Sequence, residues 1–329
     1  MYSRDDRVTE VTHQSFLGKM GGACCGLLVG LMLYAGAGAL IWWNEGRAVF
    51  TDRAIHAGLA SVVESPSCDV LDATLEGRLV HVSCPLGRLD NYSFIGGALR
   101  VETAAFVRVD AEMYQWEEMT RSETTKDSVG GGSTTRKTYS YSTGWLGSSV
   151  DSAHFKKSSN HRNPPASAWP LTSHTQYSAD AQLGAYRLGA LVQKLQNAEP
   201  VPIPLNWPTA SDGAQLSGPQ PPSTLSRENT ISAEGKLYTA WPQQSNFPIG
   251  SMRVQFSRAT ATEASVLAAQ SRGGFVGWGA NDKVRKGYEV MQLFEGSLTA
   301  SEMFEKMADD NASLTWTLAG ARRGPPRRR

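Results

Sequence analysis

The sequence predicts an α+β protein in which one N-terminal transmembrane helix precedes a mainly β ectodomain. Three observations lead to this fold class. Residues 21–43 form an apolar run without a charged side chain, the stretches that follow alternate apolar and polar residues over short distances, and two pieces of sequence recur. A chain of 329 residues is long enough for one large domain or two small ones.

The apolar run at residues 21–43 has the properties of a retained membrane anchor. At about 1.5 Å per residue, a helix of this length exceeds a hydrocarbon core of about 30 Å. Trp42 and Trp43 at its end suit the aromatic belt of a membrane interface. A cleaved signal peptide would have a shorter apolar core and a small-residue cleavage site. A buried helix of a soluble domain is disfavoured because no face of the run is polar.

The charges that flank this run favour a cytosolic tail at residues 1–20. Arg4, Arg7 and Lys19 precede the run, whereas Arg47 and Arg53 follow it. The flank with more positive charge tends to remain in the cytosol. We therefore expect the part of the chain after the run to be lumenal.

A glycine pattern in the run predicts contact with a second helix. Gly22, Gly26 and Gly30 recur every four residues, which places them on one helix face. Small residues at this spacing let two backbones approach closely. The alternative is that glycine is simply common in membrane helices. The pattern predicts a homo-oligomer held together through the anchor.

Beyond the anchor, the sequence predicts one short helix and then strands. Residues 47–63 carry apolar side chains at helical spacing. Residues 138–142 alternate aromatic residues with serine, so we expect Trp116 and Tyr139 on facing strands of one hairpin. Residues 179–196 have leucines at near-helical spacing, which predicts a second helix there.

Proline divides the ectodomain into two predicted halves. Prolines crowd residues 199–222, which indicates an irregular connection between a first half at 44–198 and a second half at 223–314.

Similar pieces in the two halves suggest a duplicated β unit with one or more helices between. Leu75–Leu79 resembles Ala233–Leu237, and Gly97–Val101 resembles Gly250–Val254 in the same order.

The oxidation of two cysteines and the glycosylation of two sequons depend on the compartment in which the ectodomain lies. Cys68 and Cys84 would pair in an oxidising lumen, where closing a loop of that size stabilises a fold by about 3 kcal/mol. In a reducing compartment they would remain ordinary thiols.

Asn91 and Asn311 begin Asn-x-Ser triplets and are glycosylation candidates only if the ectodomain is lumenal.

The sequence contains no recognisable catalytic, cofactor or metal motif. His154 and His161 lie near Asp151 and outline a metal site, although polar loop histidines are the ordinary interpretation. Glu112, Glu117 and Glu118 are paired carboxylates of the kind used in acid–base catalysis. However, strand alternation separates 117 from the other two and favours a solvated strand edge.

We therefore expect a protein that is not an enzyme and that uses no cofactor. A net charge of +1 gives no reason to expect a nucleic-acid partner.

Five motifs in order resemble the transmembrane protein 43 family, also called LUMA. The resemblance extends from about Ser15 to Trp316, and it is specific because the motifs occur in register. The residues that carry it are Asn44, Glu45, Gly46, Arg47 and Ala48; Glu76, Gly77, Arg78, Leu79, Val80 and His81; Glu112, Met113, Tyr114, Gln115 and Trp116; Tyr139, Ser140, Tyr141 and Trp145; and His161, Arg162, Asn163 and Pro164.

The resemblance implies a protein of the endoplasmic reticulum membrane and the nuclear inner membrane. It implies one N-terminal span, a large lumenal domain and further spans near the C-terminus. It also implies self-association and nuclear-envelope partners that are emerin- and lamin-like. No enzymatic residue is established in the family, so none is carried over.

The chain departs from the family pattern at residues 315–329. Instead of apolar spans, its last ten residues contain five arginines and two prolines, which cannot continue a membrane helix. A truncated or frame-shifted end is the first interpretation, and it predicts apolar stretches in another reading frame downstream of codon 316. A natural basic tail that binds anionic lipid is the alternative.

These observations favour a membrane-anchored scaffold with a lumenal binding domain. Two other functions remain open. One is an ectodomain hydrolase with a site near Glu112 and His154. The other is a lipid- or channel-associated membrane regulator.

Overall fold

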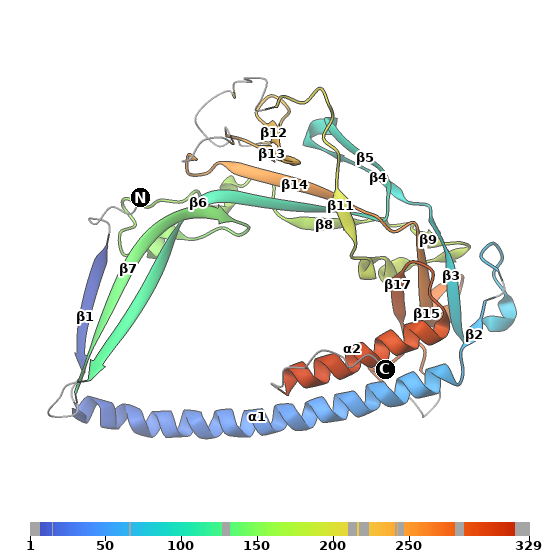
Figure 1. Ribbon diagram of the computed structural model, residues 1–329, viewed down its shortest axis with the longest axis horizontal. Coiled ribbons are helices and arrows are strands. Elements are labelled where there is room, and N and C mark those ends of the chain that lie inside the picture. The colour runs from blue at the N-terminus through green and yellow to red at the C-terminus, as the bar shows by residue number, and fades with distance from the viewer. Residues whose placement is uncertain are drawn as a thin grey trace, which may run out of the picture.

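The computed structural model describes residues 7–14, 16–65, 67–126, 132–209, 216, 224–240, 242, 247–279 and 286–319, with side chains in the first helix from Gly26 onward. Two α-helices in this part, α1 (Phe16–Leu59) and α2 (Ala300–Leu318), lie side by side along one edge of a mainly β body. Figure 1 shows α1 along the base, with β1 and the ends of β6 and β7 above its N-terminal half and β3, β15 and β17 above its C-terminal half. The predicted fold class is confirmed.

Helix α1 is longer than the sequence predicted. The expected anchor at 21–43 and the expected short helix at 47–63 form one continuous helix of 44 residues that ends at Leu59. At ~1.5 Å per residue its length is about 66 Å. The stretch contains no proline, so nothing in the backbone interrupts the helix after Trp43.

The apolar part of α1 is outside the protein core. Among the described residues, α1 contains the one helix long and apolar enough to cross a membrane, and none of its most apolar window is buried. Its large hydrophobic side chains are exposed on all sides, as expected for contact with lipid. They are Leu27, Leu28, Val29, Leu31, Met32, Leu33, Tyr34, Leu40, Ile41, Trp42 and Trp43.

The first sheet is built around a long hairpin. Strands β6 (Phe106–Lys126) and β7 (Ser133–Leu146) pair antiparallel. Trp116 lies opposite Thr143 and Tyr139 opposite Thr120, so the prediction that the two aromatic residues occupy facing strands is confirmed. The other strands of this sheet are β1 (Val8–Gln14), β8 (His174–Tyr177), β11 (Ala198–Pro200), β12 (Ile231–Ala233), β13 (Lys236–Tyr238) and β14 (Met252–Ala259).

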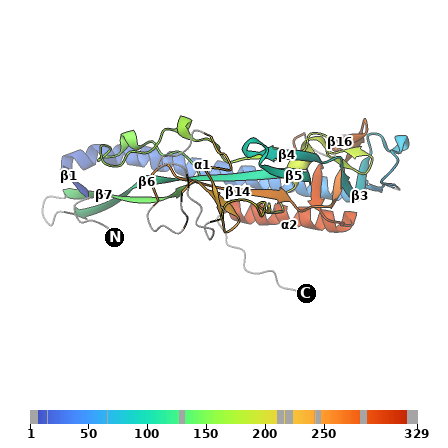
Figure 2. The same ribbon diagram turned by 90° about the horizontal axis from the view of Figure 1, so that it is seen from above.

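Strand β1 precedes α1 in the chain but pairs with β7, which follows it. The register runs from Val8 opposite Tyr139 to Gln14 opposite Ser133. Glu10 accepts a hydrogen bond from the Tyr139 hydroxyl at 3.0 Å and pairs with Lys156 at 2.7 Å. Figure 1 shows that the hairpin bends down toward the N-terminal end of α1, where β1 lies beside it, and Figure 2 shows the same end from above. Both ends of the apolar stretch are therefore joined to the same β body.

The second sheet contacts α2 and encloses most of the remaining core. Its central pair is β3 (Leu79–Gly87) with β15 (Glu263–Ser271). Its other strands are β2 (Val63–Glu64), β9 (Gln182–Leu183), β10 (Tyr186–Arg187), β16 (Gly274–Val276) and β17 (Gln292–Glu295). A small separate sheet pairs β4 (Asp90–Phe94) with β5 (Leu99–Ala104). Short 3-10 turns are η2 (Ala73–Leu75), η3 (Ile95–Gly97), η4 (Ser152–His154), η5 (Ala166–Ala168) and η6 (Gly189–Lys194).

The predicted helix at 179–196 is wrong. This segment forms β9, β10 and η6 instead. Gly184 and Gly189 have φ angles of 56° and 52°, a left-handed conformation that interrupts a right-handed helix. The near-helical spacing of the apolar residues reflects burial of an irregular segment, since Leu183, Leu188 and Leu191 all lie in the core.

The recurring pieces share a turn but not a set of strand pairings. Gly77 and Gly235 have nearly the same positive φ, 74° and 73°. However, the strand after Gly77 is β3, which pairs with β15, whereas the strand after Gly235 is β13, which pairs with β14. The repeat is therefore local.

Strands from both sides of the proline-rich segment are neighbours in each sheet. Strand β14 pairs with β6, and β15 pairs with β3. The segment itself contributes to the core through Val201 and Trp207, which are buried. Most of residues 210–223 lies outside the described part of the chain.

Candidate functional site: the junction of α1 and α2

Helix α2 is fixed to the body by its first turns. Thr299 forms a reciprocal capping box with Glu302, and hydrogen bonds from the Thr299 backbone and hydroxyl lower the pKa of the Glu302 carboxyl. Met303 and Phe304 are buried in a cluster with Ile55 of α1.

A glycine allows the two helices to approach closely. A Cβ atom at Gly58 would lie 2.9 Å from the Phe304 ring, which is closer than side-chain contacts normally are. The absence of a side chain at this position of α1 therefore makes room for Phe304 of α2.

A cluster of polar side chains joins the helices one turn beyond the apolar stretch. The Asn44 amide donates to the Thr315 carbonyl at 3.0 Å, and Asn44 is 1% exposed. The Arg47 guanidinium donates to Asn311 Oδ1 at 2.9 Å and to Thr315 Oγ1 at 2.8 Å. It also donates to Asn44 Oδ1 at 3.3–3.4 Å. These four residues are called the polar junction below.

The polar junction explains part of the first family motif. Buried polar groups are stable only when their hydrogen bonds are satisfied, so Asn44 and Arg47 fix the angle at which α1 leaves the body. Glu45, by contrast, is exposed, and Gly46 has no neighbour close enough to exclude a side chain. The anchor is therefore joined to the body through a defined set of contacts.

The predicted sequons differ in their surroundings. The Asn311 amide nitrogen donates to the Ala48 carbonyl at 3.1 Å, and its oxygen accepts from Arg47. A sugar on that nitrogen would replace one of its two hydrogens and add bulk where α2 contacts α1. Asn91 is exposed, and its side-chain oxygen accepts from the Thr103 backbone at 2.8 Å.

The second motif, Glu76-Gly77-Arg78, forms the turn that leads into β3. The Glu76 carboxylate accepts from the Arg272 backbone at 2.9 Å, and Gly77 donates to the Gln270 carbonyl at 2.9 Å. The Arg78 carbonyl accepts from Gln270 at 3.2 Å. These contacts join the turn to the end of β15, which pairs with β3, so the motif has a structural role here.

The motifs around Tyr114 and His161 pack against each other. Asn163 receives a hydrogen bond from the Trp116 backbone nitrogen at 2.7 Å and donates to its carbonyl at 2.8 Å. His161 is 2% exposed, stacks on Tyr141 with ring centroids 4.0 Å apart and meets Trp116 edge-on at 4.5 Å. Tyr114 donates to or accepts from Thr143 at 2.7 Å. This arrangement holds a long loop against the hairpin.

The residues proposed for catalysis have other partners. Glu112 forms an ion pair with Arg253 at 2.6 Å, and Glu118 accepts from the Tyr141 hydroxyl at 2.7 Å. Glu117 is exposed. His154 contacts Asp151 at 3.4 Å, with both side chains largely in solvent. Within the described residues, no three His, Cys, Asp or Glu side chains are placed to hold a metal ion.

Cys68 and Cys84 are joined in the structure. Their sulfur atoms are 1.99 Å apart and their Cα atoms 5.7 Å apart, within the usual range for a disulfide. Gly184 lies against this bridge, since a Cβ atom there would be 2.3 Å from the Cys68 carbonyl oxygen. The bridge ties the segment after β2 to β3.

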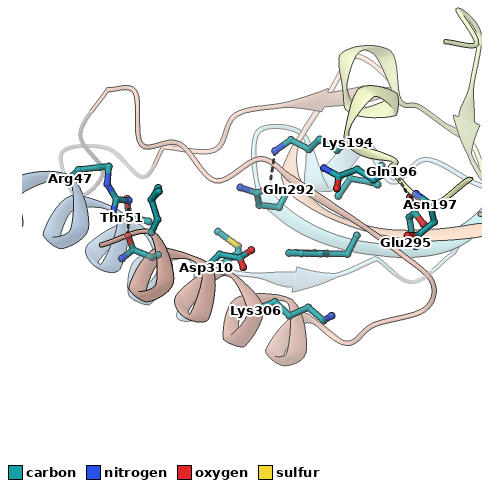
Figure 3. Close-up of a pocket in the computed structure, with 14 residues that line it drawn as sticks. Arg47, Thr51, Lys194, Gln196, Asn197, Gln292, Glu295, Lys306 and Asp310 are labelled. Atoms are coloured by element: carbon teal, nitrogen blue, oxygen red, sulfur yellow. Dashed lines mark hydrogen bonds between the residues drawn. The ribbon is translucent and has the colours of Figure 1, made fainter. Parts of the chain in front are cut away.

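A cavity of about 560 Å³ adjoins the polar junction. It lies between α1, α2, η6 and β17, and Figure 3 shows side chains from all four elements around it. Arg47, Lys194 and Lys306 are its cationic residues, and Glu295 and Asp310 its acidic ones. Apolar side chains from β17 and α2 complete the wall.

No other part of the described chain covers the glycine pattern of α1 where its surroundings are described. No atom lies within 4 Å of a Cβ position built at Gly26 or Gly30. The surroundings of Gly22 lie outside the described residues.

Comparisons with known proteins agree on one family. The family model described as "Transmembrane protein 43" matches residues 113–321. Transmembrane protein 43 of Rattus norvegicus is 28% identical, over 96% of this chain and 75% of the relative. The Drosophila melanogaster homologue is 28% identical over 88% and 71%, and the Homo sapiens protein 27% identical over 96% and 75%. No solved structure matches this chain.

Proposed function

The chain belongs to the transmembrane protein 43 family, and from this membership we propose that it is a scaffold anchored in the endoplasmic reticulum membrane and the nuclear inner membrane. It is a membrane protein whose apolar helix contacts the lipid bilayer. The proposed role is to organise membrane protein complexes through self-association and through a lumenal binding domain.

One observation carries this proposal. Helix α1 continues without a break from a fully exposed apolar stretch into the polar junction, where Asn44 and Arg47 bind α2. A rigid connection of this kind transmits the orientation of the anchor to the body. Such a connection favours a protein that positions other proteins at a membrane over one whose soluble domain acts independently.

The compartment of the body is part of the proposal. A lumenal body at residues 44–314 supplies the oxidising environment in which the Cys68–Cys84 bridge is stable. The N-terminal residues 1–20 would then be cytosolic, where emerin- and lamin-like proteins are proposed as partners of the family.

Crossing of the membrane has a structural consequence for β1. A helix that crosses the bilayer separates the residues before it from the residues after it, and polar strands do not enter the hydrocarbon core. We therefore infer that β1 leaves β7 when α1 is inserted. The pairing of β1 with β7 then describes the chain before α1 has crossed the membrane.

Catalysis by the ectodomain has less support. The hydrolase alternative needs Glu112 and His154 near each other, but Glu112 is held by Arg253 and His154 by Asp151 on an exposed turn. We propose no enzymatic activity.

Self-association in the correct membrane tests the scaffold role. We expect the full chain to fractionate with endoplasmic reticulum and nuclear-envelope membranes and to associate with itself in a membrane reporter assay. Gly26→Ile should weaken that association because the larger side chain separates the backbones. Ala35→Ile, which adds bulk to another exposed face of α1, is the matched control.

Two results would count against the scaffold. One is a Gly26→Ile chain that associates as strongly as the parent. The glycine pattern would then have no role in helix contact and would reflect only the frequency of glycine in membrane helices. The other is accumulation of the full chain in the plasma membrane alone.

A further inference from the structure

We propose that the cavity beside the polar junction binds the phosphate headgroup of an anionic membrane phospholipid. This inference goes beyond the scaffold role and uses only the membrane anchoring of α1. Four properties of the cavity support it: its cations without ion-pair partners, the neutral surroundings of Lys194, the balance of charge in its wall, and its position along α1.

The three cations of the cavity form no ion pair within the described residues. The Lys194 ammonium donates to the Gln292 side-chain oxygen at 2.8 Å, which is a neutral acceptor (Figure 3). The acceptors around Arg47 are amide and hydroxyl oxygens, which are also neutral. The Lys306 ammonium lies 5.7 Å from the centre of the Phe294 ring. Each cation can therefore still accept an anionic partner.

Lys194 is the most informative of these groups, although its side chain is exposed. Its surroundings lower the pKa of the Lys194 ammonium, because the protein shields the charged form from water. A negative group placed beside it would compensate for this lost solvation and raise the pKa again. An exposed lysine whose one hydrogen-bond acceptor is neutral, and whose charged form is disfavoured by the nearby protein, is available to bind an anion.

The acidic residues limit the charge of the ligand. Glu295 already accepts hydrogen bonds from the Gln196 and Asn197 backbones at 2.5 and 2.8 Å. Asp310 is exposed one helical turn from Lys306. Three cations and two carboxylates leave the wall with a surplus of about one positive charge. This surplus matches a phosphodiester, which carries one negative charge, better than it matches a polyphosphate.

The position of the cavity suits a lipid. Arg47 lies one turn beyond Trp43, where the apolar stretch of α1 ends. Met307 and Leu314 contribute apolar surface to the same wall. A headgroup in the cavity can therefore extend its glycerol toward these side chains and its acyl chains along the exposed face of α1. A volume of about 560 Å³ is sufficient for a headgroup with its glycerol.

Binding to defined lipid bilayers tests the proposal. The full chain is placed in nanodiscs of phosphatidylcholine with and without phosphatidylglycerol, and lipids retained by the purified protein are counted by native mass spectrometry. We expect selective retention of phosphatidylglycerol. Lys194→Gln and Lys306→Gln should each weaken it about tenfold, since a charge-assisted hydrogen bond is lost.

Two further variants separate binding from folding. Asp310→Asn removes a negative charge from the wall and should tighten retention several-fold, a gain that misfolding cannot produce. Lys137→Gln removes an exposed cation from β7, away from the cavity, and should change nothing.

The outcomes are distinct. Equal retention by the parent, Lys194→Gln and Asp310→Asn would overturn the site, even if the chain still self-associates in its membrane. Competition by inorganic phosphate as effective as that by short-chain phosphatidylglycerol would overturn the lipid assignment and indicate a free phosphate as the ligand.

Discussion

Replacing Phe304 with alanine is expected to lower the free energy of unfolding by about 4 kcal/mol, the cost of truncating a large buried aromatic side chain. Phe304 is 2% exposed and packs in one cluster with Ile55 of α1 and Leu79 of β3. The cavity left by its ring cannot be filled from α1, because the nearest position is Gly58. The effect is large because this side chain touches both helices and the second sheet.

Unfolding of the detergent-solubilised chain in guanidinium, followed by tryptophan fluorescence, measures this change. Glu305→Ala is the matched control, since it alters the neighbouring exposed residue of the same helix and should change stability by less than about 0.5 kcal/mol. A loss below about 1 kcal/mol for Phe304→Ala would mean that α2 does not depend on this contact.

Removal of the Cys68–Cys84 bridge is expected to cost about 3 kcal/mol, the usual stabilisation for closing a loop of this size. Cys84 is 3% exposed and lies in β3 within the core of the second sheet. The bridge holds the segment against which Gly184 packs, so it also supports the turn between β9 and β10. A reducing agent should destabilise the parent by the same amount as the double replacement Cys68→Ser, Cys84→Ser.

The control for this prediction is the double variant itself under reducing conditions. It should show no further loss of stability, because it has no bridge to break. If the reducing agent affects the parent and the double variant equally, the bridge does not contribute to the fold.

The sequence predicted those parts of the fold that depend on local pattern. The apolar run at 21–43 identified α1, because periodicity and length are visible in neighbouring residues. The alternation around Tyr139 identified the β6–β7 hairpin for the same reason. The helix itself continues past Trp43, the predicted end of the anchor, because no proline interrupts it where the polarity changes.

Helix α2 was not predicted, although a local signal for it exists. Thr299 and Glu302 have the spacing of a capping box, and this pair precedes the buried Met303. At residues 179–196 the error was the reverse, because an α-helix was predicted where the chain forms short strands and a 3-10 turn. There the apolar spacing was helical, but Gly184 and Gly189 favour left-handed backbone that no pattern of leucines reveals.

The polar junction and the cavity could not be predicted from the sequence. Asn44 was recognised only as part of a family motif, and its partner Thr315 is 271 positions away in the chain. Lys194 and Lys306 have no unusual sequence context and come together only because η6, β17 and α2 surround one space. Sites of this kind depend on long-range packing, so a single sequence does not contain a readable signal for them.

Protease protection of sealed microsomes tests most directly whether α1 is an anchor with a lumenal body. One tag is placed at the N-terminus and a second in the connection between β6 and β7. We expect protease added outside to remove the N-terminal tag and to spare the second tag until detergent opens the vesicles. Protection of both tags, or digestion of both, would contradict the account. Either result would place both tags on the same side of the membrane, so α1 would not cross it and the pairing of β1 with β7 would need no disruption.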